Sequence, residues 1–192
     1  PERLCNAKWV YYTSLGKGSE ALHDPLIAHV AESGAKLVFQ PGTHQLRLGI
    51  AGIGRVIAAS HVTIMNKEEC ERLVGDGTAD MRVLLKRLRS LDCEIAVITD
   101  GPNGSYAYDG KEFLALGVFE VPIVERTGCG DAFATAFVAA LHYGNDLSEA
   151  MRWGTANAAS KLGFVGPQTG LLTLDGMKKF LAKFKDIQPK RM

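Results

Sequence analysis

The segment Glu125-Arg-Thr-Gly-Cys-Gly-Asp-Ala-Phe133 carries residue types that suit phosphate chemistry. Gly128 and Gly130 allow tight backbone turns, and a helix that begins beside them would direct its first N–H groups at the loop. Such a helix start can bind a phosphate or stabilise a developing oxyanion. Asp131 would repel that anion, unless it accepts a proton from a hydroxyl about to attack a phosphoryl group. The N–H groups would then stabilise the charge on the transferred phosphate.

A structural interpretation of the same segment stands beside this one. An acidic residue in the first turn compensates the helix dipole, and glycines often serve only to make a turn. Under that interpretation Asp131 has no chemical role. The spacing within this segment does not decide between the two.

Short apolar stretches alternate with amphipathic ones along the chain. Strands are predicted at 8–13, 36–39, 61–65 and 94–99, a hairpin at 105–115, and helices at 20–33, 78–91, 132–143 and 147–162. Residues 42–54 are ambiguous, and the basic tail 178–191 is predicted as a solvated final helix with a frayed end. The alternation predicts an α/β fold, a three-layer α/β/α sandwich with a mainly parallel sheet, whose ligands bind at the carboxyl ends of strands. Without a Pro/Gly-rich linker, residues 1–192 are expected to form a single α/β domain.

Composition excludes several protein classes. The 192 residues include 22 Lys and Arg against 21 Asp and Glu, so no basic excess is available for a nucleic-acid backbone. No apolar run reaches the ~18 residues that a membrane span needs. Cys5, Cys70, Cys93 and Cys129 lie far apart without a C-x-x-C pair, which predicts reduced thiols and a cytoplasmic protein.

Five stretches, in chain order, resemble the motifs of the ribokinase-like, or PfkB, family of carbohydrate and nucleoside kinases. Thr127-Gly-Cys-Gly-Asp-Ala-Phe133 is similar to the family signature D-T-x-G-A-G-D-x-F. The other four are Asn66-Lys-Glu-Glu69, Thr99-Asp-Gly-Pro-Asn-Gly104, Asn157-Ala-Ala-Ser and Gly166-Pro-Gln-Thr-Gly170. One such motif would be weak evidence, whereas five in order are specific.

The resemblance implies that Asp131 is the general base that deprotonates the acceptor hydroxyl. Gly128, Cys129 and Gly130 would supply backbone N–H groups as an anion hole for the γ-phosphate. Cys129 stands where the family usually has Ala, so its thiol is expected to be incidental. ATP and Mg²⁺ are the implied cofactors.

The implied metal residues are Asn66 and Glu69, which would position Mg²⁺ through waters. Their structural alternative is a helix N-cap followed by a first-turn Glu. Glu125 replaces the usual Asp, whose oxygens help to hold a monovalent cation, so K⁺ is a further candidate that the longer side chain puts in question. Arg126 would add positive charge near the phosphates or pair with Glu125.

The implied nucleotide residues are Thr99, Gly101 and Gly104, which would line the phosphates and the ribose. A strand-to-turn connection that needs glycine is the alternative. Asn157 would lie against the adenine, and its alternative is a polar surface residue of an amphipathic helix.

The implied function is ATP-dependent phosphorylation of a hydroxyl on a sugar or a nucleoside. Family members carry an N-terminal segment with the first strands and a lid, so we expect this chain to be the C-terminal, nucleotide-binding part of a longer kinase. The alternative is a catalytically incomplete nucleotide-binding module. Its exposed sheet edge would favour association with a second copy as a homodimer.

Overall fold

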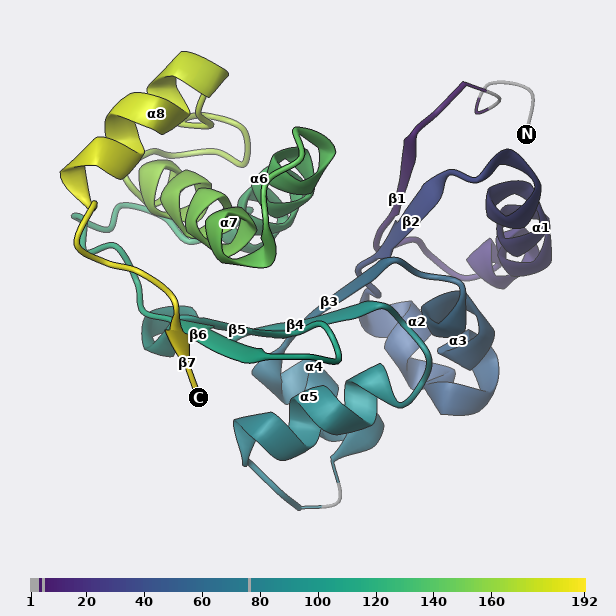
Figure 1. Ribbon diagram of the computed structural model, residues 1–192. Coiled ribbons are helices and arrows are strands. Elements are labelled where there is room, and N and C mark those ends of the chain that lie inside the picture. Colours follow the sequence, from purple (N-terminus) through teal and green to yellow (C-terminus); the bar gives the residue numbers. More distant parts are fainter. Residues whose placement is uncertain (1–3, 5, 76) are drawn as a thin grey trace. The chain divides into compact units, whose positions relative to one another are not determined.

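The structure, a computed structural model, describes Leu4, residues 6–75 and residues 77–192 (Figure 1), so Cys5 lies outside the described residues. Its contacts form two compact units. The first holds the described residues up to Ile98 together with Tyr108–Glu112, and the second holds Thr99–Ala107 and Phe113–Met192. A single α/β domain over residues 1–192 stays a prediction.

The first unit is built on four strands in sequential order. These are β1 (Trp9–Tyr12), β2 (Lys36–Phe39), β3 (Val62–Asn66) and β4 (Ile95–Thr99). β2 pairs in parallel with both β1 and β3, and Val38 lies opposite Val62. Leu37, Val38 and Phe39 are at most 1% exposed, which explains why β2 is a continuous apolar run rather than an alternating one.

Helices connect these strands, as the alternating pattern predicts. They are the 3-10 helix η2 (Ser19–Leu22), α1 (His23–Ser33), α2 (Thr43–Arg47), α3 (Gly49–Ala58), α4 (Lys67–Val74) and α5 (Met81–Arg89). α1 ends at Gly34, whose φ of 70° is the left-handed conformation of a helix stop. The ambiguous stretch 42–54 is helical, because α3 buries Ile53 and Ile57 completely despite its glycines.

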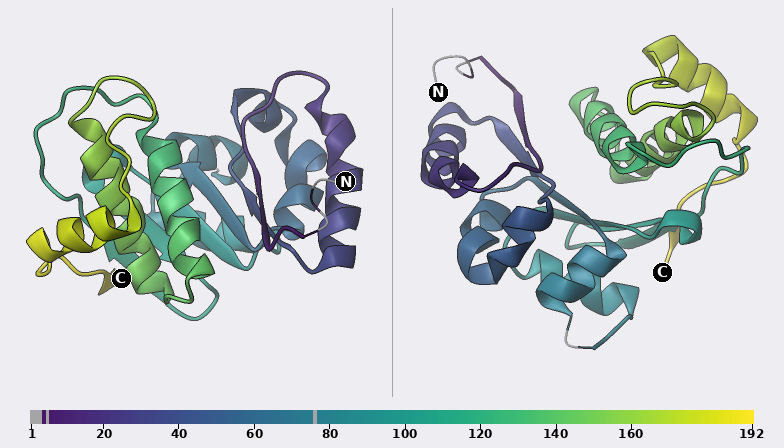
Figure 2. Two further views of the ribbon diagram at one scale, coloured as in Figure 1. Left: turned by 90° about the horizontal axis from the view of Figure 1, so that it is seen from above. Right: turned by 180° about the vertical axis from the view of Figure 1, so that it is seen from behind.

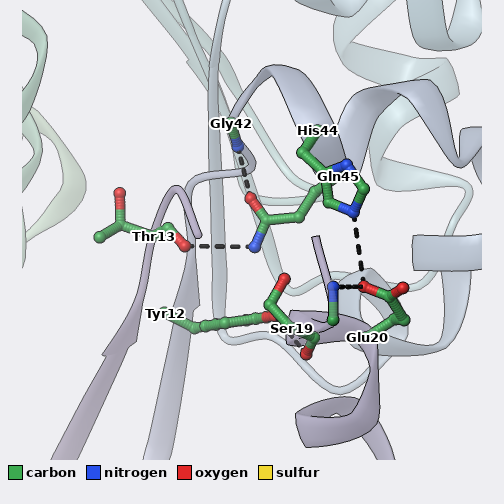
Figure 3. A network of polar contacts seen from close by, with 8 residues as sticks. Tyr12, Thr13, Ser19, Glu20, Gly42, His44 and Gln45 are labelled. Carbon is green, nitrogen blue, oxygen red and sulfur yellow. Dashed lines mark hydrogen bonds and ion pairs between the residues drawn. The ribbon is translucent and has the colours of Figure 1, made fainter. Parts of the chain in front are cut away.

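The segments that follow β1 and β2 are joined by a polar network (Figure 3). The fully buried Gln45 amide is its centre. Its Oε1 accepts the Gly42 N–H at 2.7 Å, and its Nε2 donates to the Thr13 carbonyl at 3.2 Å. Nearby, the His44 ring lies 3.4 Å from the Glu20 carboxylate. These bonds fix the turn after β2, which opens α2.

The second unit consists of short strands, a 3-10 helix and three α-helices. Its elements are η3 (Gly101–Asn103), β5 (Ser105–Tyr108), β6 (Phe113–Leu116), α6 (Cys129–His142), α7 (Leu147–Leu162), α8 (Leu174–Lys183) and β7 (Lys190–Arg191). α6 and α7 lie side by side, and α8 contacts α7 (Figure 2). Across both units, no helix of the described residues has the length and apolar character that crossing a membrane requires.

The C-terminal tail differs from the sequence-based expectation. The predicted helix to residue 191 is wrong beyond Lys183, since the chain leaves α8 and ends as β7. β7 pairs antiparallel with β6, placing Arg191 opposite Leu114, and the Met192 N–H donates to the Phe113 carbonyl at 3.0 Å. The physical reason is that β6 offers unpaired backbone groups along its edge, and the tail satisfies them.

We expect that deleting residues 190–192 lowers the free energy of unfolding by about 1–3 kcal/mol, because β6 loses its backbone partner. The melting temperature should fall by about 2–10 °C in a circular dichroism melt. Lys190→Ala keeps the backbone pairing and serves as the control, with an unchanged melting temperature. A deletion variant as stable as the wild type would show that β7 contributes no stability.

Candidate functional site

The start of α6 depends on a glycine. Gly128 is the N-cap with φ 80° and ψ 2°, in the left-handed region. A Cβ on Gly128 would lie 3.0 Å from the Pro167 carbonyl oxygen and 3.2 Å from the Pro167 Cα. Conformation and space therefore both require glycine here. α6 begins at Cys129, earlier than the predicted residue 132, so Asp131 lies in its first turn.

The backbone N–H groups at this helix start are not equivalent. The Ala132 N–H donates to the Gly128 carbonyl at 2.9 Å, and the Cys129 N–H donates to the Arg126 carbonyl at 3.2 Å. Gly130 lies in the first turn, where the helix supplies no acceptor for its N–H. An anion could therefore accept the Gly130 N–H directly. For the Cys129 N–H it would have to compete with the Arg126 carbonyl oxygen. The anion hole of Gly128, Cys129 and Gly130 stays a prediction.

Asp131 is exposed, so its side chain is accessible from solvent. Its backbone carbonyl is occupied by the Thr135 hydroxyl, which donates at 2.8 Å within α6. The position thus suits both interpretations of the sequence, a proton acceptor and a residue that compensates the helix dipole. The role of Asp131 as the base stays a prediction.

The loop that follows β4 is a tight turn. Gly104 has φ 97°, and a Cβ there would lie 2.1 Å from the Leu116 carbonyl oxygen. The Asp100 N–H donates to the Gly104 carbonyl at 2.8 Å, and Gly101 opens η3 with φ 49°. The turn alternative for these glycines is therefore realised, and their approach to a nucleotide stays a prediction.

One cavity of about 440 Å³ brings the two loops together within the second unit. This volume falls in the range of small-molecule sites, ~300–1,000 Å³. It is lined by residues of the two loops and by apolar side chains. The two loops contribute Thr99, Gly101, Gly104, Arg126, Cys129 and Gly130, and the walls include Val118, Phe119, Val121, Ile123, Phe133 and Leu162.

Ser105 is a lining residue that the sequence analysis did not single out. It is 1% exposed, and its hydroxyl has no hydrogen-bond partner among the residues that the structure describes. Buried polar groups usually have partners, so a ligand in this cavity could satisfy the hydroxyl. Its place directly after Gly104, at the start of β5, was the available signal, but a strand pattern does not tell which hydroxyl will be left unpaired.

Asn157 lies in the interior of the second unit. It is 5% exposed, so the surface alternative is wrong. Its Nδ2 donates to the Ala132 carbonyl and its Oδ1 accepts the Leu172 N–H, both at 2.8 Å. Asn157 is not among the cavity-lining residues, whereas Thr155 and Ala158 of the same helix are. The amide thus ties α6 and α7 to the segment before α8, and its adenine contact stays a prediction.

Asn66 and Glu69 belong to the first unit and form a capping box at the start of α4. Asn66 Oδ1 accepts the Glu69 N–H at 2.8 Å, and Glu69 Oε2 accepts the Asn66 N–H at 2.9 Å. Burial raises the pKa of the Glu69 carboxyl. The structural alternative for this pair is therefore present. The second carboxylate oxygen of Glu69 suits a metal-bound water, and the Mg²⁺ role stays a prediction.

The Glu125 carboxylate accepts hydrogen bonds from a backbone N–H and from a hydroxyl. Its Oε2 accepts the Gly166 N–H at 2.7 Å, and this bond, with a second one from the Thr127 hydroxyl, holds the pKa of the Glu125 carboxyl below its usual value. Within the described part of the chain, no ion pair joins Glu125 to Arg126. The metal role of Glu125 stays a prediction.

The described cysteines Cys70, Cys93 and Cys129 are free thiols. Burial raises the pKa of Cys70 to about 12 and that of Cys93 to about 11, and it also raises the pKa of Cys129. A thiolate nucleophile is disfavoured at all three positions. Among the described residues, no group of three His, Cys, Asp or Glu side chains could hold a metal ion.

Comparison with known proteins identifies the family. Residues 2–174 match the family described as pfkB family carbohydrate kinase. This chain belongs to that family. A 5-dehydro-2-deoxygluconokinase of Shouchella clausii is 32% identical over 134 residues, which is 66% of this chain and 41% of the relative. A cytidine kinase of Thermococcus kodakarensis is 37% identical over 105 residues, 54% of this chain and 38% of that protein.

The solved structures confirm the predicted ribokinase-like α/β fold. A putative ribokinase II from E. coli, in complex with ATP and Mg²⁺, has a TM-score of 0.84 at 18% identity. The match covers 95% of this chain and 61% of that one. This chain therefore spans about two fifths of the two curated relatives and about three fifths of the solved structure. The sheet is mixed, parallel at its start and antiparallel between β6 and β7.

Gly128→Ala should destabilise the protein by about 1–3 kcal/mol, because Ala strains at positive φ and its Cβ meets Pro167. The melting temperature should fall by about 2–10 °C in a thermal melt. Gly163→Ala is the matched control, since Gly163 has φ −77° and its nearest neighbouring atom is 3.7 Å from the added Cβ. Equal melting temperatures for the two variants would contradict the requirement for glycine at Gly128.

Substitutions at Asn66 separate capping from metal positioning. Asn66→Ala removes the cap and should cost about 1 kcal/mol, whereas Asn66→Ser keeps a capping oxygen and should melt like the wild type. If Asn66 also positions Mg²⁺, the Ser variant should bind MgATP more weakly while its affinity for metal-free ATP is unchanged. The affinities are measured by calorimetry. If both variants bind MgATP as tightly as the wild type, Asn66 caps α4 but does not position Mg²⁺.

Proposed function

We propose that this chain binds MgATP and that, within the complete protein, it phosphorylates a hydroxyl of a sugar or a nucleoside. The observation that supports the proposal is a cavity lined by residues of both predicted loops, which lie within Thr99–Gly104 and Arg126–Gly130. Membership of the pfkB family supports the reaction class. The two curated relatives are a sugar-acid kinase and a cytidine kinase by name, which supports either acceptor class.

In this proposal the apolar part of the cavity takes the nucleotide base. Thr99, Gly101 and Gly104 lie beside the ribose and the phosphates, because a glycine turn lets the backbone approach them closely. Asn157 is proposed to lie near the adenine, because it belongs to α7, whose Thr155 lines the cavity. Arg126 lines the cavity from the other loop, and its guanidinium can pair with a phosphate.

The chemical step places the γ-phosphate at the start of α6. The Asp131 carboxylate takes the proton of the acceptor hydroxyl, the oxygen attacks the γ-phosphorus, and ADP leaves. The Gly130 N–H and the positive end of the helix stabilise the charge on the transferred group. Asn66 and Glu69 are the residues that would hold Mg²⁺ through waters, and the ion would supply further positive charge to the phosphates of the nucleotide.

A nucleotide-binding module without turnover is the second candidate. These 192 residues align with about two fifths of the two curated relatives, so binding of MgATP by this chain and catalysis of phosphate transfer are separate questions. Among the described strands, β1 stands first in the order, and such an end strand can pair with a second copy. This candidate predicts MgATP binding, no product with any acceptor, and a dimer in solution.

Asp131→Ala tests the base assignment. We expect the variant to bind MgATP at least as tightly as the wild type in a calorimetric titration, because the lost carboxylate repels phosphate. In the complete protein, the rate of phosphorylation should fall by about 10²–10⁴-fold. Asp131→Asn, which keeps the size but not the charge, should lose the same rate.

Two results would contradict the proposal. A full phosphorylation rate in Asp131→Ala would remove Asp131 as the base. Absence of MgATP binding by both forms, with a cooperative melt proving that they are folded, would remove the nucleotide site itself.

A further inference from the structure

A fully buried lysine side chain lies between the segment that precedes α6 and the segment that follows α7. Lys161, in the last turn of α7, is 0% exposed. Its Nζ donates to the Phe164 carbonyl at 3.0 Å and to the Glu125 carbonyl at 3.4 Å. Lysine is almost never fully buried unless its charge is compensated, so this position calls for an explanation beyond packing.

The two acceptors come from the two segments that shape the predicted phosphate site. Glu125 precedes the turn that leads to Gly128 and α6, and Phe164 precedes the turn from Gly166 to Gly170. Two carbonyl oxygens that converge on one point repel each other, because both carry partial negative charge. A cation between them turns this repulsion into attraction and fixes the distance between the segments.

The charge of Lys161 also reaches the first residue of α6. It opposes the rise that burial causes in the pKa of the Cys129 thiol. It further lowers the pKa of the Glu125 carboxyl, after the stronger effects of the hydrogen bonds from Gly166 and Thr127. A positive charge is therefore felt at the helix start where the phosphate is proposed to bind.

A separate monovalent cation at Glu125 does not fit this arrangement. The Glu125 carbonyl already accepts the Lys161 ammonium, and Oε2 of its carboxylate accepts the Gly166 N–H. Two oxygens of Glu125 that could coordinate K⁺ thus already accept hydrogen bonds from groups of the chain itself. An ammonium and K⁺ both bind carbonyl oxygens as single positive charges, so one can do the work of the other.

We propose that Lys161 is a positioning residue whose ammonium acts as the built-in monovalent cation of the phosphate loop, so that nucleotide binding at this site needs no K⁺. The inference rests on the proposed function for its nucleotide part only. Its structural part, one cation holding the Glu125 and Phe164 carbonyls together, can be tested without nucleotide.

The first experiment measures melting temperatures in KCl, NH₄Cl and tetramethylammonium chloride at equal ionic strength. The wild type should melt at the same temperature in all three. Lys161→Ala should melt about 4–10 °C lower in tetramethylammonium, because the Glu125 and Phe164 carbonyls lose their donor and the side chain leaves a cavity. K⁺ or NH₄⁺ should restore part of that loss by entering the space left by the side chain.

Lys161→Met is the matched variant, since it removes the charge but fills the space. It should be destabilised like Lys161→Ala and should not respond to K⁺ or NH₄⁺. Lys178→Ala, at an exposed position of α8, controls for the loss of any lysine and should behave like the wild type in every salt. Identical responses of the Ala and Met variants to the three salts would overturn the proposal.

The second experiment measures MgATP affinity by calorimetry in the K⁺ and tetramethylammonium salts. The wild-type dissociation constant should be equal in both. Lys161→Ala should bind about tenfold more weakly in tetramethylammonium and recover in K⁺, which loss of stability alone would not produce in a folded variant. A wild-type affinity that rises tenfold with K⁺ would overturn the proposal, and this arm requires no variant to fold.

The two proposals fail in different ways. If the wild type binds no MgATP in any salt, the proposed function fails, and the melting temperatures still decide whether Lys161 replaces a cation. If the wild type binds MgATP but only in K⁺, the nucleotide site stands and the role of Lys161 falls.

Discussion

The start of α6 is held in place by the segment that follows α7, and the geometry of the candidate site depends on that contact. Gly128 packs directly against Pro167, which leaves no room for a side chain. The Glu125 carboxylate accepts the Gly166 N–H, and the Lys161 ammonium joins the carbonyls on either side. A turn, a hydrogen bond and a buried charge thus converge on one helix terminus.

This arrangement would suit the proposed phosphate chemistry. Donors stabilise developing charge best when they are already oriented, because little reorganisation is then needed during the reaction. A loop of glycines would be mobile by itself, since glycine loses the most conformational freedom on ordering. The Asn157 amide strengthens the same region by tying the Ala132 carbonyl of α6 to the Leu172 N–H.

Much of the fold follows from local patterns. α7 spans Leu147–Leu162 and β2 spans Lys36–Phe39, with the bounds that the local sequence pattern predicts. The failures have identifiable causes. Glycines in α3 weaken the helical signal that its buried Ile53 supplies, and β7 forms because a distant strand edge offers backbone partners. A pairing between segments so far apart leaves no trace in local spacing.

The family and the residues that carry its motifs follow from residue type and order along the chain. Which of these residues share a cavity, and what each polar group contacts, depends on how distant segments pack together. Ser105 and Lys161 are ordinary members of a strand and a helix until packing removes water from around them. Burial makes a hydroxyl or an ammonium without a partner energetically unfavourable, because no solvent is present to satisfy its hydrogen bonds.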